Sequence, residues 1–293
     1  MIPIKPKLTT TISSPDNREW IPDSFKSFLL ELEHIISSCE GTDPLPLFRG
    51  QTNCKWRLDS SFVRNFIQKT FSIDQSIHLN ASIRQSIFFH RLIAYAFLFK
   101  FNILGKPHKE LFDHENLNGI DPWFEFIKNL QQYPEEDYPN FIKGTFLLDW
   151  TYSKEVALYF ATYTNKGSER HLDSNQGALW VYDAVATGAT LQIGKLGDIF
   201  KKMQEKRFLN GEKTFPLLFH PKVQIAQPRA KNQSPIYIAQ MNFCFDLAGI
   251  WVQYEKQKAK KVFIKLILKN SLKKDAAEYL TNKGLTEASI YPV

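Results

Sequence analysis

Residues 147–161 have the sequence LLDWTYSKEVALYFA, in which an apolar run gives way within a few residues to a helical pattern. The apolar run ends at Asp149-Trp150-Thr151, and Thr151 or Ser153 can cap the helix that follows. Small and aromatic side chains then recur at helical spacing over 156–161. The stretch therefore predicts a strand that leads directly into a helix, whose alanines allow close packing on a sheet.

A second informative stretch lies about 100 residues earlier, where an apolar run ends in Phe48-Arg49-Gly50-Gln51. The Arg49 guanidinium stays charged and offers a planar fork of donors that suits phosphate or carboxylate. The adjacent Gly50 lets a backbone or a ligand approach closely. We expect a short strand over 45–49 whose end directs Arg49 into a cleft.

Composition and charge limit the classes of protein to which the chain can belong. The chain has 293 residues, of which 43% are hydrophobic and 23% charged, which is ordinary for a soluble globular protein. The longest uninterrupted apolar run, 92–99, is too short to cross a bilayer, and the N-terminus lacks the pattern of a signal peptide. Three widely spaced cysteines fit neither a zinc site nor a disulfide framework. We expect a cytoplasmic protein with no membrane segment.

The chain divides into segments of different pattern. Residues 1–20 are rich in Thr, Ser and Pro and indicate a flexible N-terminal arm, while 21–293 form a single domain. The fold class is α+β, with a helical N-terminal half after an early strand and then a mostly antiparallel sheet. The expected helices cover 25–39, 59–104, 123–132, 153–163, 194–207 and 273–283. The expected strands cover 45–49, 178–182, 189–193, 223–226, 236–245, 251–254 and 262–268.

On these stretches the chain resembles the FRG domain family, which is named for its (Phe/Tyr)-Arg-Gly motif. Phe48-Arg49-Gly50 carries that motif, LLDWT with VALYFA in 147–161 is close to the family's second signature, and IYIAQMNFCF in 236–245 looks like its third. The match covers most of the chain. Two departures are that Gln132-Tyr133 lacks the His and Gly of the family's Gln-His-Tyr-Gly segment, and that Thr145-Phe146 replaces its Thr-Arg.

The order of these motifs is similar to that of ADP-ribosyltransferases, an enzyme class that uses NAD as substrate. By that resemblance Arg49, beside Gln51, would hold the pyrophosphate of NAD. Thr151 and Ser153 would order the cleft around the nicotinamide ribose. Gln240 would stand where those enzymes carry a catalytic glutamate, and Asp149 is a second candidate catalytic residue. The seven histidines show no HExxH or paired-ligand spacing, so we expect no metal, and we expect a bacterial protein.

Gln240, in place of the catalytic glutamate of those enzymes, changes the chemistry that the site can perform. A carboxylate stabilises the positive charge that develops on the ribose, whereas a neutral amide does so only weakly, at a cost of roughly 10²–10³ in rate. Asp149 supplies that charge, or another carboxylate such as Asp246 or Glu255 does, or the site binds without transferring. The sequence leaves these three alternatives open.

Two further hypotheses compete with the nucleotide site. The net charge of +7 is concentrated in the lysines of 256–274, which would suit a non-catalytic nucleic-acid- or protein-binding module of a bacterial defence or toxin system. Such a charge also serves solubility alone. In a purely structural alternative, Arg49 and Asp149 form a buried ion pair, and Gln51 and Gln240 complete a polar network.

Overall fold

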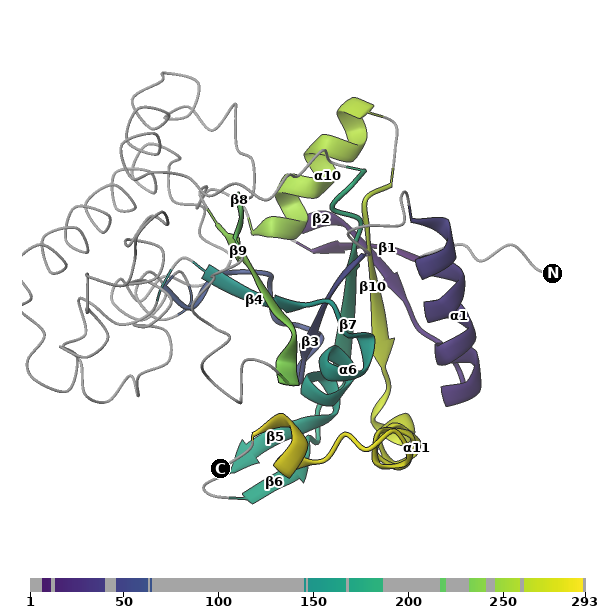
Figure 1. The fold of residues 1–293 in the computed structure, drawn as a ribbon. Coiled ribbons are helices and arrows are strands. Elements are labelled where there is room, and N and C mark those ends of the chain that lie inside the picture. The colour runs from purple at the N-terminus through teal and green to yellow at the C-terminus, as the bar shows by residue number, and fades with distance from the viewer. Residues whose placement is uncertain are drawn as a thin grey trace, which may run out of the picture.

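The computed structural model describes residues 7–11, 14–39, 46–62, 64, 145, 147–166, 169–186, 217–219, 232–240, 246–258 and 261–291. In this part of the chain eight strands form one sheet, and two more form a separate ribbon (Figure 1). In spatial order the sheet contains β1 (Lys7–Thr11), β2 (Ser14–Trp20), β10 (Phe263–Leu268), β7 (Gly177–Tyr182), β3 (Leu47–Gln51), β4 (Leu147–Thr151), β9 (Pro235–Ala239) and β8 (Leu217–Phe219). The ribbon pairs β5 (Tyr163–Lys166) with β6 (Glu169–Leu172).

Helices follow and cover these strands. The described helices are α1 (Phe25–Ser38), α6 (Lys154–Thr162), α10 (Leu247–Lys258), α11 (Lys273–Asn282), α12 (Glu287–Ile290) and a 3₁₀ turn at Asn270–Leu272. Neighbouring strands of the large sheet run antiparallel, except that β2 and β10 run parallel. The prediction of mixed helix and sheet, with mostly antiparallel strands, is confirmed for the described residues.

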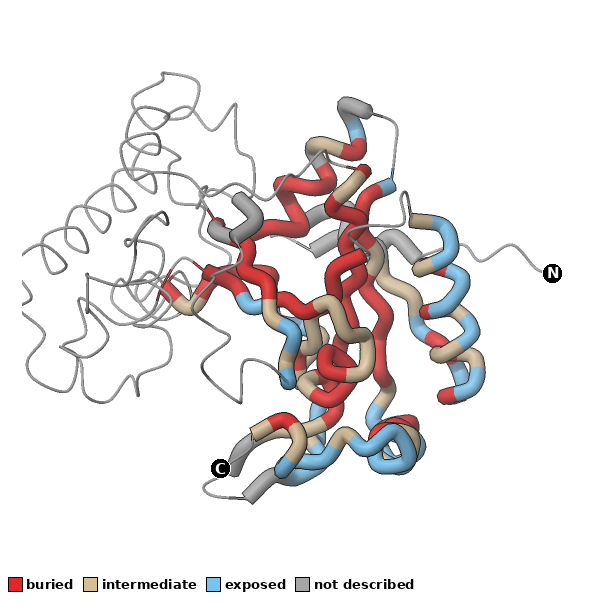
Figure 2. The backbone as a smooth tube through the Cα atoms, viewed as in Figure 1, coloured by how far each residue is buried: buried red, intermediate tan, exposed pale blue. Residues whose placement is uncertain are grey.

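The large sheet buries side chains on both faces, since successive residues of a strand point to opposite sides. One face carries Trp150 of β4 and Trp180 of β7 and is covered by α10, and we call it the tryptophan face. The other, which we call the helix face, packs against α1, α6 and α11. Figure 2 shows buried residues along the central strands and exposed ones on the outer side of α1.

The closest approach between layers is between β3 and α6, which crosses in front of β3 and β7 in Figure 1. A Cβ atom added to Gly50 would lie 1.8 Å from the carbonyl oxygen of Ala157. One added to Gly177, at the start of β7, would lie 2.3 Å from the carbonyl oxygen of Ala161. Glycine is therefore required at both positions, because the α6 backbone occupies the space of a side chain.

Several predicted elements are confirmed. The helix α1 begins after Ser24, whose side chain accepts a hydrogen bond from the backbone N–H of Ser27. The helix α6 has Ser153 as its N-cap, as the sequence suggests. Strands β7 and β10 and helix α11 lie within two residues of their predicted bounds. Gly284 follows α11 with a φ of 75°, the left-handed conformation of a helix stop.

Two predictions differ from the structure. The segment 251–254 belongs to the helix α10 and is not a strand. Asp246 precedes this helix and accepts a hydrogen bond from the backbone N–H of Gly249, so the capping signal and burial on the sheet outweigh the strand propensity of Trp251 and Val252. The N-terminal segment, expected as a flexible arm, supplies β1 and β2, and β2 pairs with β10. The sheet consequently begins before the early strand β3.

Other predictions lie outside the described residues. They are most of the helical block 59–104, the helices 123–132 and 194–207, the strands 189–193 and 223–226, and the end of the strand predicted for 236–245.

We expect Gly50→Ala to lower the free energy of unfolding by about 3 kcal/mol or more, because the added methyl group would overlap the α6 backbone. Urea unfolding followed by circular dichroism measures the change. Gly284→Ala is the matched control: nothing lies within 4 Å of its added Cβ, so only backbone strain of about 1 kcal/mol is expected. Equal losses in the two variants would contradict the close contact.

Candidate functional site

Arg49 lies on the tryptophan face, at the centre of the sheet. It pairs with Trp180 across β3 and β7, Trp180 pairs with Lys265 of β10, and Lys265 pairs with Glu19 of β2. The Lys265 ammonium forms an ion pair with Glu19 and stands 5.1 Å from the centre of the Trp180 ring. The four residues form one row across the sheet, in which the strand positions of Arg49 and Lys265 flank that of Trp180.

The guanidinium of Arg49 is only partly satisfied. Its Nη1 donates a hydrogen bond to the backbone carbonyl of Asp149, which connects β3 to β4. Its Nε is buried and has no hydrogen-bond partner in the part of the chain that the structure describes. Burial, with the nearby Arg64 guanidinium as a second cause, lowers the pKa of Arg49 to about 10, while Asp149 opposes the shift. Arg49 therefore remains a cation at neutral pH, with a donor left over.

Asp149 and Thr151 project to the other face of the sheet. Leu148 and Trp150 belong to the core of the tryptophan face, so the residues alternating with them point to the helix face. The pairing of Thr151 with Phe48, a helix-face residue, agrees with this. The sequence-predicted cleft lined jointly by Arg49, Asp149 and Thr151 is not formed, because a one-residue offset along β4 separates their faces.

Thr151 and Ser153 have local partners. The Thr151 hydroxyl donates to the carbonyl of Gln233 at 2.7 Å and accepts from the Ser153 N–H at 3.0 Å. The Ser153 hydroxyl accepts from the Val156 N–H at 3.2 Å and donates to Glu155 at 3.2 Å. Their hydroxyls order the turn from β4 into α6, which is a structural role.

Gln240 is fully buried and bonded at both ends of its amide. Its Oε1 accepts from the Ser60 N–H at 2.7 Å, and its Nε2 donates to Asp59 Oδ1 at 2.9 Å. The position follows the tryptophan-face residues Ile236 and Ile238 of β9 by four and two residues, respectively. Gln240 thus shares a face with Arg49, but its amide holds the segment 59–60 in place.

A polar network extends from Gln240 toward the centre of the sheet. Arg57 Nε lies 3.2 Å from Asp59 Oδ2, within ion-pair distance but without hydrogen-bond geometry. The carbonyl of Arg57 accepts from Gln51 Nε2 at 3.2 Å, and Gln51 Oε1 accepts from the Trp180 indole at 2.8 Å. Gln51 and Gln240 are thus connected through Arg57 and Asp59, and not through the Arg49–Asp149 ion pair on which the predicted network is based, because the described Arg49 hydrogen bond goes to the backbone carbonyl of Asp149.

Asp59 and Arg57 were missed as site residues in the sequence. The signal available was their place in 56–61, WRLDSS, directly after the arginine motif, since a buried Arg-x-Asp pair needs mutual compensation. Asp246, named only as a spare carboxylate, also belongs here. It accepts from the N–H groups of Leu58 and Gly249 at 3.2 and 2.9 Å.

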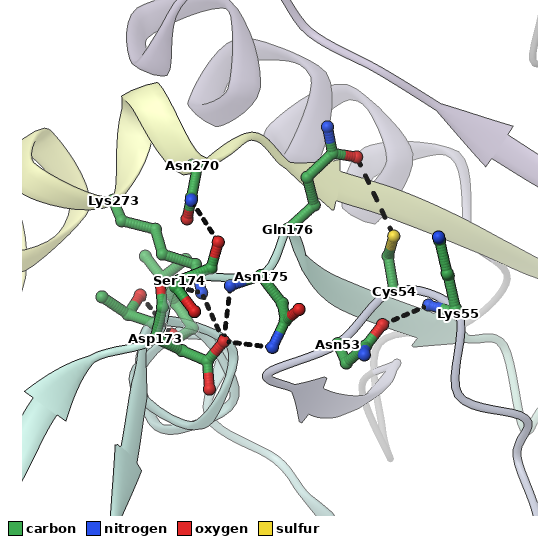
Figure 3. Close-up of polar contacts among 11 residues, drawn as sticks. Asn53, Cys54, Lys55, Asp173, Ser174, Asn175, Gln176, Asn270 and Lys273 are labelled. Carbon is green, nitrogen blue, oxygen red and sulfur yellow. Dashed lines mark hydrogen bonds and ion pairs between the residues drawn. The ribbon is translucent and has the colours of Figure 1, made fainter.

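The lysines of the basic C-terminal region are partly used within the protein. Lys265 pairs with Glu19, Lys269 with Asp23, and buried Lys273 lies 3.9 Å from a carboxylate oxygen of Asp173. Lys273 also donates to the Asp173 carbonyl at 3.2 Å. Figure 3 shows Lys273 and Asn270 reaching the loop 173–176, while Cys54 approaches Gln176 from the loop after β3. These contacts connect the loop after β3, the loop 173–176 and the segment that leads into α11 at one end of the sheet.

No described helix has the length and apolar character to cross a membrane, and the described residues contain no group of three potential metal ligands. Protein-family models, curated proteins and solved structures give no match to the chain. The FRG and ADP-ribosyltransferase resemblances therefore remain predictions.

Asp246 predicts a pH dependence of stability. Burial, and then the charge of Asp59, raise the pKa of Asp246 from 3.8 to about 6. The native state therefore binds this proton more tightly than the unfolded state between those values. The contribution to unfolding free energy is largest below pH 4, falls by on the order of 2–3 kcal/mol up to pH 6, and is then constant.

Urea unfolding from pH 4 to 8 of wild type and Asp246→Asn isolates this contribution as their difference. In Asp59→Asn, which removes the neighbouring charge, the pH step should move to lower pH. A difference between wild type and Asp246→Asn that does not vary with pH would contradict the assignment.

Proposed function

We propose that this protein binds a nucleotide of the NAD type through its phosphates, with Arg49 as the principal contact. The resemblance to FRG domains, and beyond them to ADP-ribosyltransferases, supports this class of ligand. A planar guanidinium suits a pyrophosphate, because it can form two parallel hydrogen bonds to the pyrophosphate oxygens.

The observation that carries the proposal is the buried Arg49 Nε, for which no described residue supplies an acceptor. An unsatisfied donor on a buried charged group costs more than the roughly 1–3 kcal/mol of a neutral one. The donor is therefore expected to have an acceptor when the protein is at work. A phosphate oxygen supplies both the acceptor and the opposite charge.

The charges around Arg49 point to an anionic ligand. In the row across the sheet, Lys265 is compensated by Glu19. For Arg49 the described hydrogen-bond acceptor is a neutral carbonyl, and the Arg64 guanidinium is close enough to disfavour its charge. An anion between the two arginines would relieve that repulsion.

Binding is proposed here in preference to transfer. The Gln240 amide is engaged by Ser60 and Asp59, and the Asp149 side chain belongs to the helix face. Asp246 accepts two backbone N–H groups, and Glu255 Oε1 accepts the Val262 N–H at 2.6 Å. Asp246 and Glu255 thus hold backbone groups of the fold, while the Asp149 carboxylate acts on Arg49 as a charge from the opposite face of the sheet.

Calorimetric titration with NAD, ADP-ribose and inorganic pyrophosphate tests the proposal. We expect wild type to bind at least one of them, and Arg49→Gln to bind it about tenfold or more weakly, because a charge-assisted hydrogen bond is lost. Arg49→Lys keeps the charge but loses the planar fork, so its affinity should fall between the two.

Lys274→Gln is the matched control, since Lys274 is exposed on α11 and the variant removes the same charge. It should bind as wild type does. Absence of binding to wild type, or equal weakening by Arg49→Gln and Lys274→Gln, would overturn the proposal.

A further inference from the structure

Three tryptophans of the tryptophan face differ in how their indole N–H groups are satisfied. Trp180 Nε1 donates to Gln51 Oε1 at 2.8 Å. Trp150 Nε1 and Trp251 Nε1 have no hydrogen-bond partner among the described residues, and both are buried, with their residues only 2% and 1% exposed. A buried indole N–H normally has an acceptor, so these two are exceptions that need a physical reason.

The two unpaired indoles are neighbours of each other, and Trp150 is also a neighbour of Arg49 on the sheet. The rings of Trp150 and Trp251 meet edge to face with centroids 5.6 Å apart. In the antiparallel register that pairs Phe48 with Thr151, Arg49 comes level with Trp150 on the same face. Three unpaired buried donors, the two indoles and Arg49 Nε, therefore belong to adjoining residues.

Packing alone does not explain the unpaired indoles. Trp251 stacks on Tyr182 with centroids 4.1 Å apart, and Trp150 meets Tyr182 edge to face at 6.0 Å. Phenylalanine would fill such an aromatic cluster without burying an N–H group. The sequence instead places indole donors beside a cation, which is the donor set that an oxyanion requires.

We propose that Trp150 and Trp251 donate their indole N–H groups to phosphoryl oxygens of the ligand held by Arg49. The inference rests on the proposed nucleotide function and extends it. It assigns the tryptophan face, between β4 and α10, as the wall of the phosphate site. Trp180 takes no part in ligand binding because its donor is already used by Gln51.

Indole N–H signals in ¹⁵N–¹H NMR spectra test the proposal directly. The chain contains six tryptophans, so the six signals can be assigned by single Trp→Phe substitutions. On addition of NAD, ADP-ribose or inorganic pyrophosphate, the signals of Trp150 and Trp251 should move downfield, as expected for new hydrogen bonds to a charged acceptor. The Trp180 signal should move least of the three, and adenosine, which lacks phosphate, should move none.

Affinity gives a second measurement. Trp150→Phe and Trp251→Phe should each weaken binding about tenfold or more, as expected for a lost hydrogen bond to a charged group. Trp56→Phe, the same substitution at a half-exposed tryptophan outside this cluster, should bind as wild type does. If either Phe variant fails to fold, benzothienylalanine at that position keeps the ring shape and removes only the N–H donor.

The outcomes separate the two proposals. If wild type binds the nucleotide, Arg49→Gln weakens it, and both indole signals and the Trp→Phe affinities stay unchanged, the indole assignment is overturned while nucleotide binding stands. If wild type binds none of the phosphate ligands, both proposals fall. Downfield indole shifts with weakened Trp→Phe variants establish the assignment.

Discussion

The structure depends on the direct contact between the backbone of β3 and the backbone of α6. Gly50 and Gly177 have no side chains, and the helix fills the space that side chains would take. This contact requires small residues on both partners, which Ala157 and Ala161 supply. Gly50 and Gly177 therefore set the distance between α6 and the central strands β3 and β7.

That contact also decides what Arg49 can do. Because side chains alternate along a strand, a Gly50 that faces the helix requires Arg49 and Gln51 to face the tryptophans. A charged side chain then enters an aromatic environment, where its hydrogen bonds are stronger and its unpaired donors more costly. The alternation of side chains along β3 thus explains both residues of the motif. Gly50 allows the helix to approach, and Arg49 places a charge on the opposite face of the sheet.

The sequence predicts local structure well and the assembly of the site poorly, for a physical reason. Caps such as Ser24 and Ser153 and the helical spacing after them act over a few residues, so α1 and α6 are predictable. The faces of Arg49 and Asp149 depend on the register of two strands separated by about 100 residues, and motif order alone cannot supply it. The helix α10 was missed for a related reason, since burial on a distant sheet outweighed the strand propensity of Trp251 and Val252.

The buried polar groups of the tryptophan face differ in whether they have hydrogen-bond partners, and this difference supports the proposed location of the ligand. Gln240 and Asp246 have their hydrogen-bond partners within the protein, and Asp59 accepts from Gln240 through Oδ1 while its Oδ2 has only the ion-pair contact with Arg57, so a network of this kind specifies the fold. Among the described residues, Arg49 Nε and the indoles of Trp150 and Trp251 have no acceptor. Each unmatched donor lowers stability by about 1–3 kcal/mol, against a total of roughly 5–15 kcal/mol for a whole domain. Three such donors on adjoining residues are an arrangement that folding alone disfavours and that an oxyanion would complete.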